Sequence, residues 1–384
     1  MGHLNQLQEK PYRDLIERLN HYPVGAPRTE EMFEILNILY TKEEAAVGAK
    51  FPLGPATLAE LTKKTGIPEP QLNEILEGMA LKGVVLDFTP KDTRFFLLAP
   101  TIFGFFEFSF MRLNSDLPRG RLAELMDNLR PDMGREFFSS ETQMSRALVY
   151  EGNVADITSQ VMSYDQVSEL IRKSPYLSLQ TCFCRHKAKH RGYDCQAPLD
   201  VCMGLGVAAE FLTRRGFARQ STLDEMLHVL DKTEKLGLVH ITDNVRDDPL
   251  FICHCCTCCC ELLKGINELK IDHAVTPSRF MAHIAPGQCA GCTGCARKCP
   301  VQAIGISTGT AVVNQQRCLG CSVCVSGCKP GAISMKPRPK PGPIPKSQLI
   351  RHIKIATQKG RLRHMLFYAA SRLLRLPYYL KPIA

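Results

Sequence analysis

Two stretches of this 384-residue chain repeat one cysteine pattern, C-x2-C-x2-C-x3-C. The first reads CAGCTGCARKCP at residues 289–300, and the second reads CLGCSVCVSGCKP at residues 318–330. Corresponding cysteines lie 29 residues apart, and the same offset relates AIGIS at 303 to AISMK at 332. The segment is therefore an internal repeat. The convergence of several thiols in each copy constrains the backbone more tightly than an apolar pattern would.

The rest of the sequence argues against disulfides as the role of these thiols. The chain has 18 cysteines, but its 384 residues are ample for an ordinary hydrophobic core without covalent staples. Its start, MGHLNQLQEKPYRDLIERLN, has no apolar stretch suited to a secretory signal, and no window has the apolar length of a membrane-spanning helix. We therefore expect a cytoplasmic protein with reduced thiols, which points to metal binding.

The loop spacing suits a cubane iron–sulfur cluster. Closely spaced thiolates on a Gly-rich loop can reach three of its irons, so the fourth ligand must come from elsewhere. Residues 281–336 resemble the bacterial two-cluster ferredoxin domain, in which each repeat lends its last cysteine to the other cluster. The resemblance implies one-electron transfer between two close [4Fe-4S] clusters. It assigns Cys289, Cys292, Cys295 and Cys328 to one cluster, and Cys318, Cys321, Cys324 and Cys299 to the other.

This segment departs from the family pattern at one point. Pro300 directly follows Cys299, whereas Lys329 separates Cys328 from Pro330. The extra lysine changes the turn after one crossing cysteine and removes no ligand. Zinc is the alternative metal, but paired C-x2-C zinc sites rarely carry the third and fourth cysteines of both repeats.

Residues 181–280 are predicted to form a cysteine-rich metal-binding domain of the α/β type. The stretch TCFCRHKAKHRGYDCQAPLDVCMGLG supplies four thiols, enough for one metal centre, from Cys182, Cys184, Cys195 and Cys202. Their order, C-x-C and later C-x6-C, does not identify the metal. The four thiols can bind an iron–sulfur cluster, bind zinc, or be buried or redox-active thiols without a metal. The neighbouring ferredoxin-like segment favours a cluster.

A second group, CHCCTCCC, places six cysteines within residues 253–260. We expect a hairpin around NVRDDP before it and a helix over ELLKGINEL after it. Because adjacent residues of a strand face opposite ways, all six thiols cannot serve one cubane on a regular backbone. Cys255 and Cys258 offer a second choice of ligands, and the set can be shared between two centres. The spacing of a cluster loop favours Cys253, Cys256 and Cys259.

Two weaker signals lie in the same region. His186 and His190 are four residues apart and can be ligands, but the basic run RHKAKHR favours solvated side chains or a site for an anionic substrate group. GLGVAA at 204–209 fits a dinucleotide fingerprint, but cysteines rather than an apolar strand precede it. We expect Gly204 and Gly206 to end a metal loop and open a helix.

Residues 1–29 are predicted as an N-terminal helical segment, and residues 30–100 as a winged-helix-like domain. Gly66 and Gly83 are expected to end two of its helices, and VVLDFTPKDTRFFLLAP to form a two-stranded wing. The third helix is net negative, which favours packing or partner docking over nucleic-acid binding. Helical spacing places on one face of the first helix Met32, Ile35, Leu36 and Leu39.

Residues 101–180 are predicted as a helical connecting region, with the aromatic run IFGFFEFSFM in the core rather than in a cofactor pocket. Residues 337–384 are predicted as a stiff Pro-rich linker and a basic amphipathic helix. From Lys336 onward there are twelve Lys and Arg and no acidic residue; the chain's net charge is +10, so the other 335 residues sum to −2. The helix suits an anionic membrane surface or an acidic partner, or it packs on the body.

These patterns predict an α+β multidomain iron–sulfur protein of the anaerobic type. We expect it to relay single electrons through two [4Fe-4S] clusters and one or two further centres, for which zinc is the alternative. It would act as an electron-transfer protein or oxidoreductase subunit with redox partner proteins, and its tail would touch the inner face of a membrane. The alternatives are a redox-sensing winged-helix regulator, and a reductase with a substrate site between the basic run and CHCCTCCC. No catalytic residue is assigned.

Overall fold

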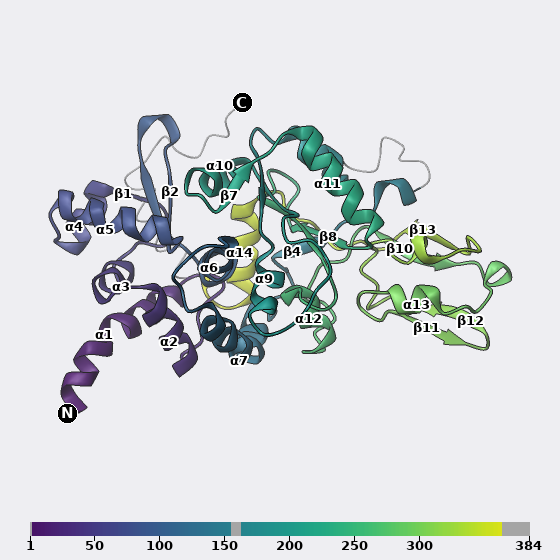
Figure 1. Cartoon of the computed structure of the whole chain (residues 1–384), viewed down its shortest axis with the longest axis horizontal. Helices are drawn as coiled ribbons and strands as arrows, with labels where there is room; N and C mark the ends of the chain where they lie inside the picture. The colour runs from purple at the N-terminus through teal and green to yellow at the C-terminus, as the bar shows by residue number, and fades with distance from the viewer. Residues whose placement is uncertain (1, 155–162, 363–384) are drawn as a thin grey trace. The chain divides into compact units, whose positions relative to one another are not determined.

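The computed structural model describes residues 2–154 and 163–362 (Figure 1). It has mixed α/β secondary structure with separate small antiparallel sheets, in agreement with an α+β fold. The chain divides into unit 1, which is Met1–Phe106, Leu125–Ser140 and His352–Ala384, and unit 2, which is Glu107–Glu124 and Glu141–Arg351. Every cysteine belongs to unit 2.

The first hundred residues of unit 1 form short capped helices and a small sheet. Thr41 and Glu44 form a capping box before α3, and Thr57 and Glu60 form another before α4. The elements are α1 Gly2–Leu19, α2 Glu30–Leu39, α3 Lys42–Ala49, β1 Ala56–Thr57, α4 Leu58–Thr65, α5 Glu69–Lys82, β2 Val85–Phe88 and β3 Phe95–Leu98.

The predicted helices and hairpin of residues 30–100 are present, with the first helix divided into α2 and α3 at Tyr40. Gly66 and Gly83 end α4 and α5 in the left-handed conformation, as predicted. The sheet order is β1-β3-β2. The single cation of α5, Lys82, lies 2.6 Å from a carboxylate oxygen of Glu44, so α5 offers no unpaired positive charge to a phosphate. The four residues predicted on the inner face of α2 are buried: Met32, Ile35, Leu36 and Leu39.

A six-stranded antiparallel sheet of order β4-β8-β9-β6-β5-β7 organises residues 141–280. The predicted hairpin is confirmed, because β8 and β9 pair from Val239↔Cys255 to Thr242↔Ile252. The elements from residue 106 onward are α6 Phe106–Met111, α7 Arg119–Phe137, β4 Ser145–Ala147, α8 Val167–Lys173, β5 Leu177–Gln180, α9 Phe183–Lys189, β6 Cys202–Leu205, α10 Gly206–Arg214, β7 Ala218–Gln220, α11 Leu223–Lys235, β8 Val239–Asp243, β9 Phe251–Cys255 and α12 Glu261–Asn267.

The two faces of this sheet pack against different kinds of side chain. Apolar residues of α8 and α11 pack against Met203 of β6 and Ile252 of β9 in one hydrophobic cluster. The neighbouring strand residues, Cys202 and Cys253, join a second cluster with the cysteines of α9. Because side chains alternate along a strand, one face of the sheet carries the apolar side chains of the hydrophobic cluster and the other face carries the cysteines. Contrary to expectation, a buried strand, β6, does precede the helix that opens at Gly206, but its sheet is antiparallel rather than of the dinucleotide-binding type.

Residues 281–336, called the repeat segment below, form two antiparallel pairs. Strand β10 Phe280–Ile284 pairs with β13 Ile333–Pro337, and β11 Ile304–Ser307 pairs with β12 Thr310–Val313. Helix α13 Gly294–Lys298 completes it. The 29-residue repeat is also a repeat of backbone conformation, because positive φ angles recur at Gly291 and Gly320, Thr293 and Ser322, and Gln302 and Gly331.

The chain after the repeat segment is more closely packed than a free linker. Arg338 donates to the carbonyl oxygens of Ser278 and Cys318, and the carbonyl oxygen of Pro345 accepts from the N–H of Arg246. The stretch predicted as a stiff Pro-rich linker is therefore packed against the rest of unit 2 at both ends. Helix α14 Gln348–Gln358 follows, and the basic helix predicted beyond residue 362 lies outside the described residues. In the described ranges, no helix combines the length and apolar character that crossing a bilayer requires.

Gly320 provides a test of the loop geometry. A Cβ at this position would collide with the carbonyl oxygen of Phe280 and the hydroxyl of Ser278, and φ is 68°. Gly331 has a similar φ of 70° but open space around a Cβ. We expect Gly331→Ala to cost about 1–2 kcal/mol from backbone strain alone, and Gly320→Ala to cost a further 1–3 kcal/mol, roughly, from the collision. Thermal unfolding of the two variants measures the difference, and equal midpoints would contradict this packing.

Candidate metal centres

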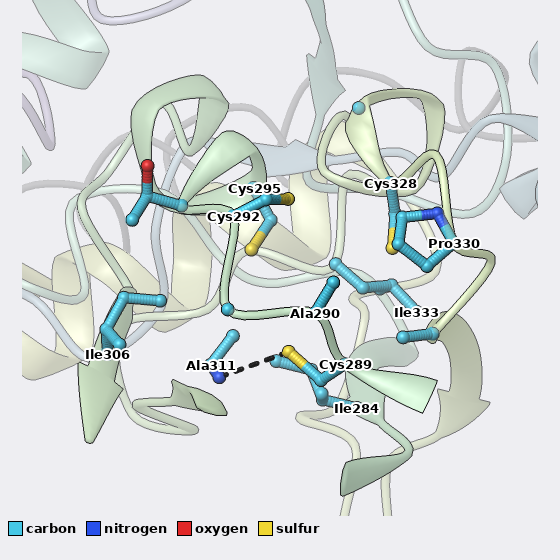
Figure 2. A pocket seen from close by; sticks show the side chains of 14 residues that line it. Ile284, Cys289, Ala290, Cys292, Cys295, Ile306, Ala311, Cys328, Pro330 and Ile333 are labelled. Atoms are coloured by element: carbon cyan, nitrogen blue, oxygen red, sulfur yellow. Dashed lines mark hydrogen bonds between the residues drawn. The ribbon is translucent and has the colours of Figure 1, made fainter. Parts of the chain in front are cut away.

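The four cysteines predicted to bind the first cluster surround one pocket of the repeat segment (Figure 2). Three come from the first loop and Cys328 comes from the second, so cysteines of both loops line the same pocket. Ile284, Ile306 and Ile333 supply an apolar wall. The N–H of Ala311 donates to the sulfur of Cys289 at 3.4 Å, and this bond lowers the pKa of the Cys289 thiol. The cysteines that line this first pocket are Cys289, Cys292, Cys295 and Cys328.

The second pocket has the same arrangement, but here three cysteines come from the second loop and one comes from the first. Cys299 of the first loop lines it beside three cysteines of the second loop, and Val301, Leu319 and Met335 add apolar surface. The N–H of Ala303 donates to the Cys299 sulfur at 3.1 Å. Burial raises the pKa of Cys321 to about 12, so a metal must replace the proton for this thiol to carry charge. The cysteines of the second pocket are Cys318, Cys321, Cys324 and Cys299.

The second pocket lies against the six-stranded-sheet part of unit 2. The hydroxyl of Ser322, between two of its cysteines, accepts from the backbone N–H of Tyr150 at 3.0 Å and from the amide of Asn153 at 3.3 Å. Its three second-loop cysteines are buried. In the first pocket, by contrast, Cys292 is exposed. The repeat segment therefore has an inner site and an outer site.

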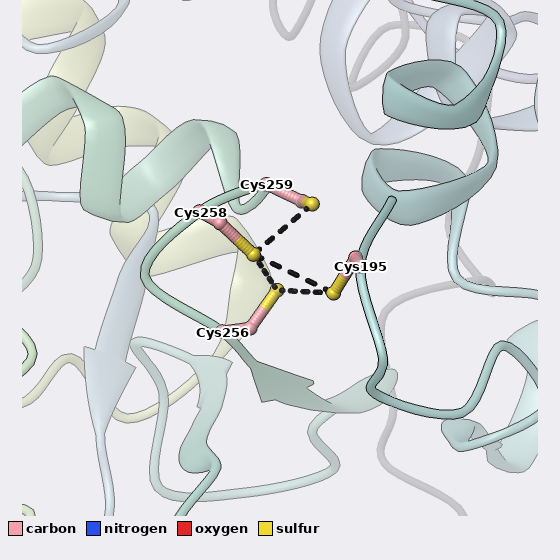
Figure 3. A group of neighbouring side chains, drawn as sticks. All are labelled: Cys195, Cys256, Cys258 and Cys259. Atoms are coloured by element: carbon pink, nitrogen blue, oxygen red, sulfur yellow. Dashed lines mark hydrogen bonds between the residues drawn. The ribbon is translucent and has the colours of Figure 1, made fainter. Parts of the chain in front are cut away.

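Four of the remaining ten cysteines gather into what we call the four-thiol set (Figure 3). Cys195 comes from the loop after α9, and the others come from the turn between β9 and α12. All four sulfurs lie within 4.8 Å of one another, and Cys195 is 3.7 Å from Cys256 and 3.5 Å from Cys258. A tetrahedral ion with bonds of about 2.3 Å holds its sulfurs about 3.8 Å apart. This set, Cys195, Cys256, Cys258 and Cys259, can hold one metal ion.

The other six cysteines form a closed six-thiol ring, in which each sulfur is hydrogen-bonded to two neighbours. The bonds run from Cys182 to Cys202, Cys253, Cys255, Cys260, Cys184 and back to Cys182. Strand β9 contributes two members because Cys253 and Cys255 point to the same face. Six thiols exceed the four ligands of a cubane, so the ring has sulfur enough for a larger or a bridged centre.

Hydrogen bonds within the ring move the pKa values of adjacent thiols in opposite directions. Bonds from Cys202 and Cys255 lower the pKa of Cys253 to about 6, and bonds from Cys184 and Cys255 lower that of Cys260 to about 5. The pKa of Cys182 is also well below the usual value, because Cys184 and Cys202 bond to it. The pKa values of the three thiols between them are raised. Half of the ring thus favours the thiolate form that binds metal.

Arg185 is a buried cation between the two sets of cysteines. Its guanidinium donates to the carbonyl oxygens of Pro198 and His254 and to the thiol of Cys256. Burial lowers the pKa of Arg185, but the charges of Cys182 and Cys256 outweigh that effect and raise it. The pKa of Cys256 is lowered to about 4, first by a bond from Cys259 and then by Arg185. The cation therefore stabilises negative charge on both sets.

The basic run of α9 is not the solvated surface predicted from its sequence. Lys187 is 2% exposed and lies 2.7 Å from a carboxylate oxygen of Glu261, and Nδ1 of the buried His186 lies 2.7 Å from the carbonyl oxygen of Phe110. The prediction of a solvated His186 is wrong because α9 packs its first turns into the protein. His190, at the end of this helix, is exposed as expected.

On the opposite face of the sheet, His240 and His254 form a fully buried imidazole pair. Their Nδ1 atoms are 2.7 Å apart, so one nitrogen carries a proton that the other accepts. Burial, followed by the charges of His240 and Arg185, holds the pKa of His254 well below its usual value, so this imidazole stays neutral. The ring of Tyr150 packs on His240 at a centroid distance of 4.9 Å. Tyr150 and the pair thus connect Ser322 of the second pocket to the middle of β9.

The cysteines predicted as ligands within residues 182–260 pack together in one cluster: Cys182, Cys184, Cys195, Cys202, Cys253, Cys256 and Cys259. Within it, Cys195 lies close to Cys256 and Cys258. Sequence reasoning left out Cys260, which completes the ring, and did not single out Arg185 or the imidazole pair. The alternation of β9 could have revealed the pairing of Cys253 with Cys255. Nothing in the local spacing indicates that Cys195 meets Cys258.

No protein-family model, curated protein sequence or solved structure matches this chain.

The division of the ten cysteines can be tested by metal content. Cys195→Ser removes a sulfur from the four-thiol set and none from the six-thiol ring, while Cys202→Ser does the reverse. We expect the first variant, purified without oxygen, to lose one metal ion per chain and keep the metal of the ring. Elemental analysis of both variants measures this. If both lose the same metal in the same amount, the ten cysteines form a single centre.

Arg185 provides a second test, of electrostatics. Reducing a nearby metal centre adds negative charge, which a buried cation stabilises, so Arg185→Gln should lower the reduction potential of the centre by on the order of 100 mV. Potentiometric titration measures the shift at matched metal content. Arg185→Lys keeps the charge and should keep most of the potential. Arg219→Gln, which removes an exposed cation paired with Glu225, should change nothing. A potential that rises or stays fixed in Arg185→Gln would contradict this role.

Proposed function

We propose that the protein is an iron–sulfur electron-transfer protein, or the electron-transfer subunit of an oxidoreductase. It relays single electrons between two [4Fe-4S] clusters of the repeat segment and the cysteine centres of residues 182–260. The observation that carries the proposal is the exchange of ligands between the two pockets. Each pocket takes three cysteines from one loop and the fourth from the other, which is the ligand pattern of two-cluster ferredoxins.

The groups that line both pockets support iron–sulfur clusters rather than zinc. A cubane needs an apolar cavity with backbone N–H groups directed at sulfur, since both tune its potential. Each pocket has apolar side chains and an N–H···S bond, to Cys289 in one and to Cys299 in the other. In the four-thiol set, by contrast, the sulfurs are in mutual contact, which suits a single tetrahedral ion. We assign one iron or zinc ion to that set, and we assign an iron–sulfur centre to the six-thiol ring because six thiols are more than a single tetrahedral ion binds.

The buried contacts give the relay an order. Ser322 beside the second pocket bonds to Tyr150, whose ring packs on His240, and His240 bonds to His254. His254 lies in β9 between two cysteines of the six-thiol ring. Electrons would pass from the first pocket to the second, and from there across this continuous buried path to the ring. Substrate chemistry, if this chain has any, belongs at the ring or on a partner.

Iron content tests the proposal. Two four-iron clusters contribute about eight irons per chain, and filled centres at residues 182–260 raise the total to about twelve to sixteen. Iron and sulfide analysis of anaerobically purified protein decides between these values. A value near eight together with zinc would limit the relay to the repeat segment, and a chain with zinc alone would refute the proposal.

The exchange of ligands predicts separable signals. Cys292→Ser removes a ligand of the first pocket only, and Cys321→Ser removes one of the second pocket only. We expect each variant to perturb one cluster signal in the EPR spectrum of the reduced protein and to leave the other largely intact. Loss of both signals from a folded Cys292→Ser protein, judged by circular dichroism, would contradict the assignment of ligands.

A further inference from the structure

The repeat segment has a net positive charge. Residues 281–336 contain no Asp or Glu, and their cations are Arg297, Lys298, Arg317, Lys329 and Lys336. The net charge of −2 over residues 1–335 conceals this local excess. Arg317 is neutralised by Asp272 at 2.6 Å, which leaves the charge concentrated around the first pocket.

Three of these cations flank the ligands of the first pocket. Arg297 and Lys298 follow Cys295 on α13, and Lys329 directly follows Cys328. All three are exposed, and within the described part of the chain none of them forms an ion pair. Lys329 is also the residue that interrupts the Cys-Pro sequence found in the first repeat, so the departure adds a charge beside a ligand.

The first pocket also has an exposed apolar side. Ile306 of β11, which lines the pocket, is 41% exposed. Cys292 is exposed at the same pocket, whereas three cysteines of the second pocket are buried. An exposed apolar side chain among unpaired cations, beside an accessible cysteine of the pocket, has the composition of a transient docking surface for an anionic protein.

We propose that this surface, formed by Arg297, Lys298, Ile306 and Lys329, docks a small acidic one-electron carrier protein. The inference rests on the proposed function, because it needs a cluster in the first pocket. On docking, the carrier would be oxidised by one electron, and a cluster held by Cys289, Cys292, Cys295 and Cys328 would be reduced by that electron. No proton or bond is transferred. The cations accelerate the encounter with an acidic surface and fix its orientation.

Stopped-flow kinetics tests this surface. The probe is a reduced plant-type [2Fe-2S] ferredoxin of net negative charge, mixed anaerobically with the full-length, cluster-loaded protein. We expect Arg297→Glu/Lys329→Glu to lower the second-order rate constant of cluster reduction at least 10-fold at low salt. At about 0.5 M salt the difference from wild type should nearly disappear, because the charges are screened.

Two controls show whether the effect is specific to this surface. Lys340→Glu/Lys346→Glu makes the same charge change on exposed lysines of the Pro-rich stretch and should keep at least half of the wild-type rate constant. Reduced methyl viologen, a small cation, should reduce the Arg297→Glu/Lys329→Glu protein at least as fast as wild type. Equal loss in both double variants, or a wild-type rate constant independent of salt, overturns the docking surface.

Two further measurements separate failure of the docking proposal from failure of the proposed function. One asks whether the chain holds a reducible cluster, and the other asks whether the surface binds lipid instead of a protein carrier. If the wild-type chain carries no reducible cluster with methyl viologen, the proposed function itself fails. Anionic phosphatidylserine vesicles provide the competing occupant for a basic surface. If Arg297→Glu/Lys329→Glu loses vesicle binding while its rate with the ferredoxin is unchanged, this surface contacts lipid and the carrier proposal is wrong.

Discussion

The alternation of strand β9 is the constraint on which the metal region depends. Adjacent residues must face opposite sides of the sheet, so Cys253 and Cys255 point toward α9 while Ile252 and His254 point toward α11. One strand thereby contributes to a sulfur ring, an apolar core and the imidazole pair at once. A shift of register by one residue would place thiols in the core and imidazoles among the thiols, so the pairing of β9 with β8 and β6 must be tightly specified.

Negative charge is the second constraint, because ten thiols lie close together in a largely buried site. Thiolates packed at this density repel one another unless cations or metal ions compensate them. The protein supplies one buried guanidinium, Arg185, in contact with both sets of cysteines. One positive charge cannot balance several thiolates, so bound metal or protonation must remove the rest of the negative charge. The fold without metal is therefore expected to hold most of these thiols protonated.

The sequence allowed some features to be predicted well and others not at all. The resemblance to two-cluster ferredoxins predicted which cysteines line each pocket, and only three of the four in each pocket come from a single tight loop. The caps at Gly66 and Gly83 were predictable because they depend on local backbone geometry. The meeting of Cys195 with Cys256 depends on strand order in a sheet that no short motif encodes. The burial of His186 was not predicted, because the basic run alone indicated solvated side chains. The partner of its imidazole is the carbonyl oxygen of Phe110, which lies 76 residues away in the sequence.

The separation of the ligands along the chain has a consequence for how this protein is made. Cys195 and Cys256 are 61 residues apart, and the six-thiol ring likewise joins residues near 182 to residues near 260. Neither set is complete until β9 and the turn after it have left the ribosome and joined the sheet. A metal ion held by either set would therefore cross-link β9 and the turn after it to the chain around α9, so that metal binding and the folding of this sheet would stabilise each other.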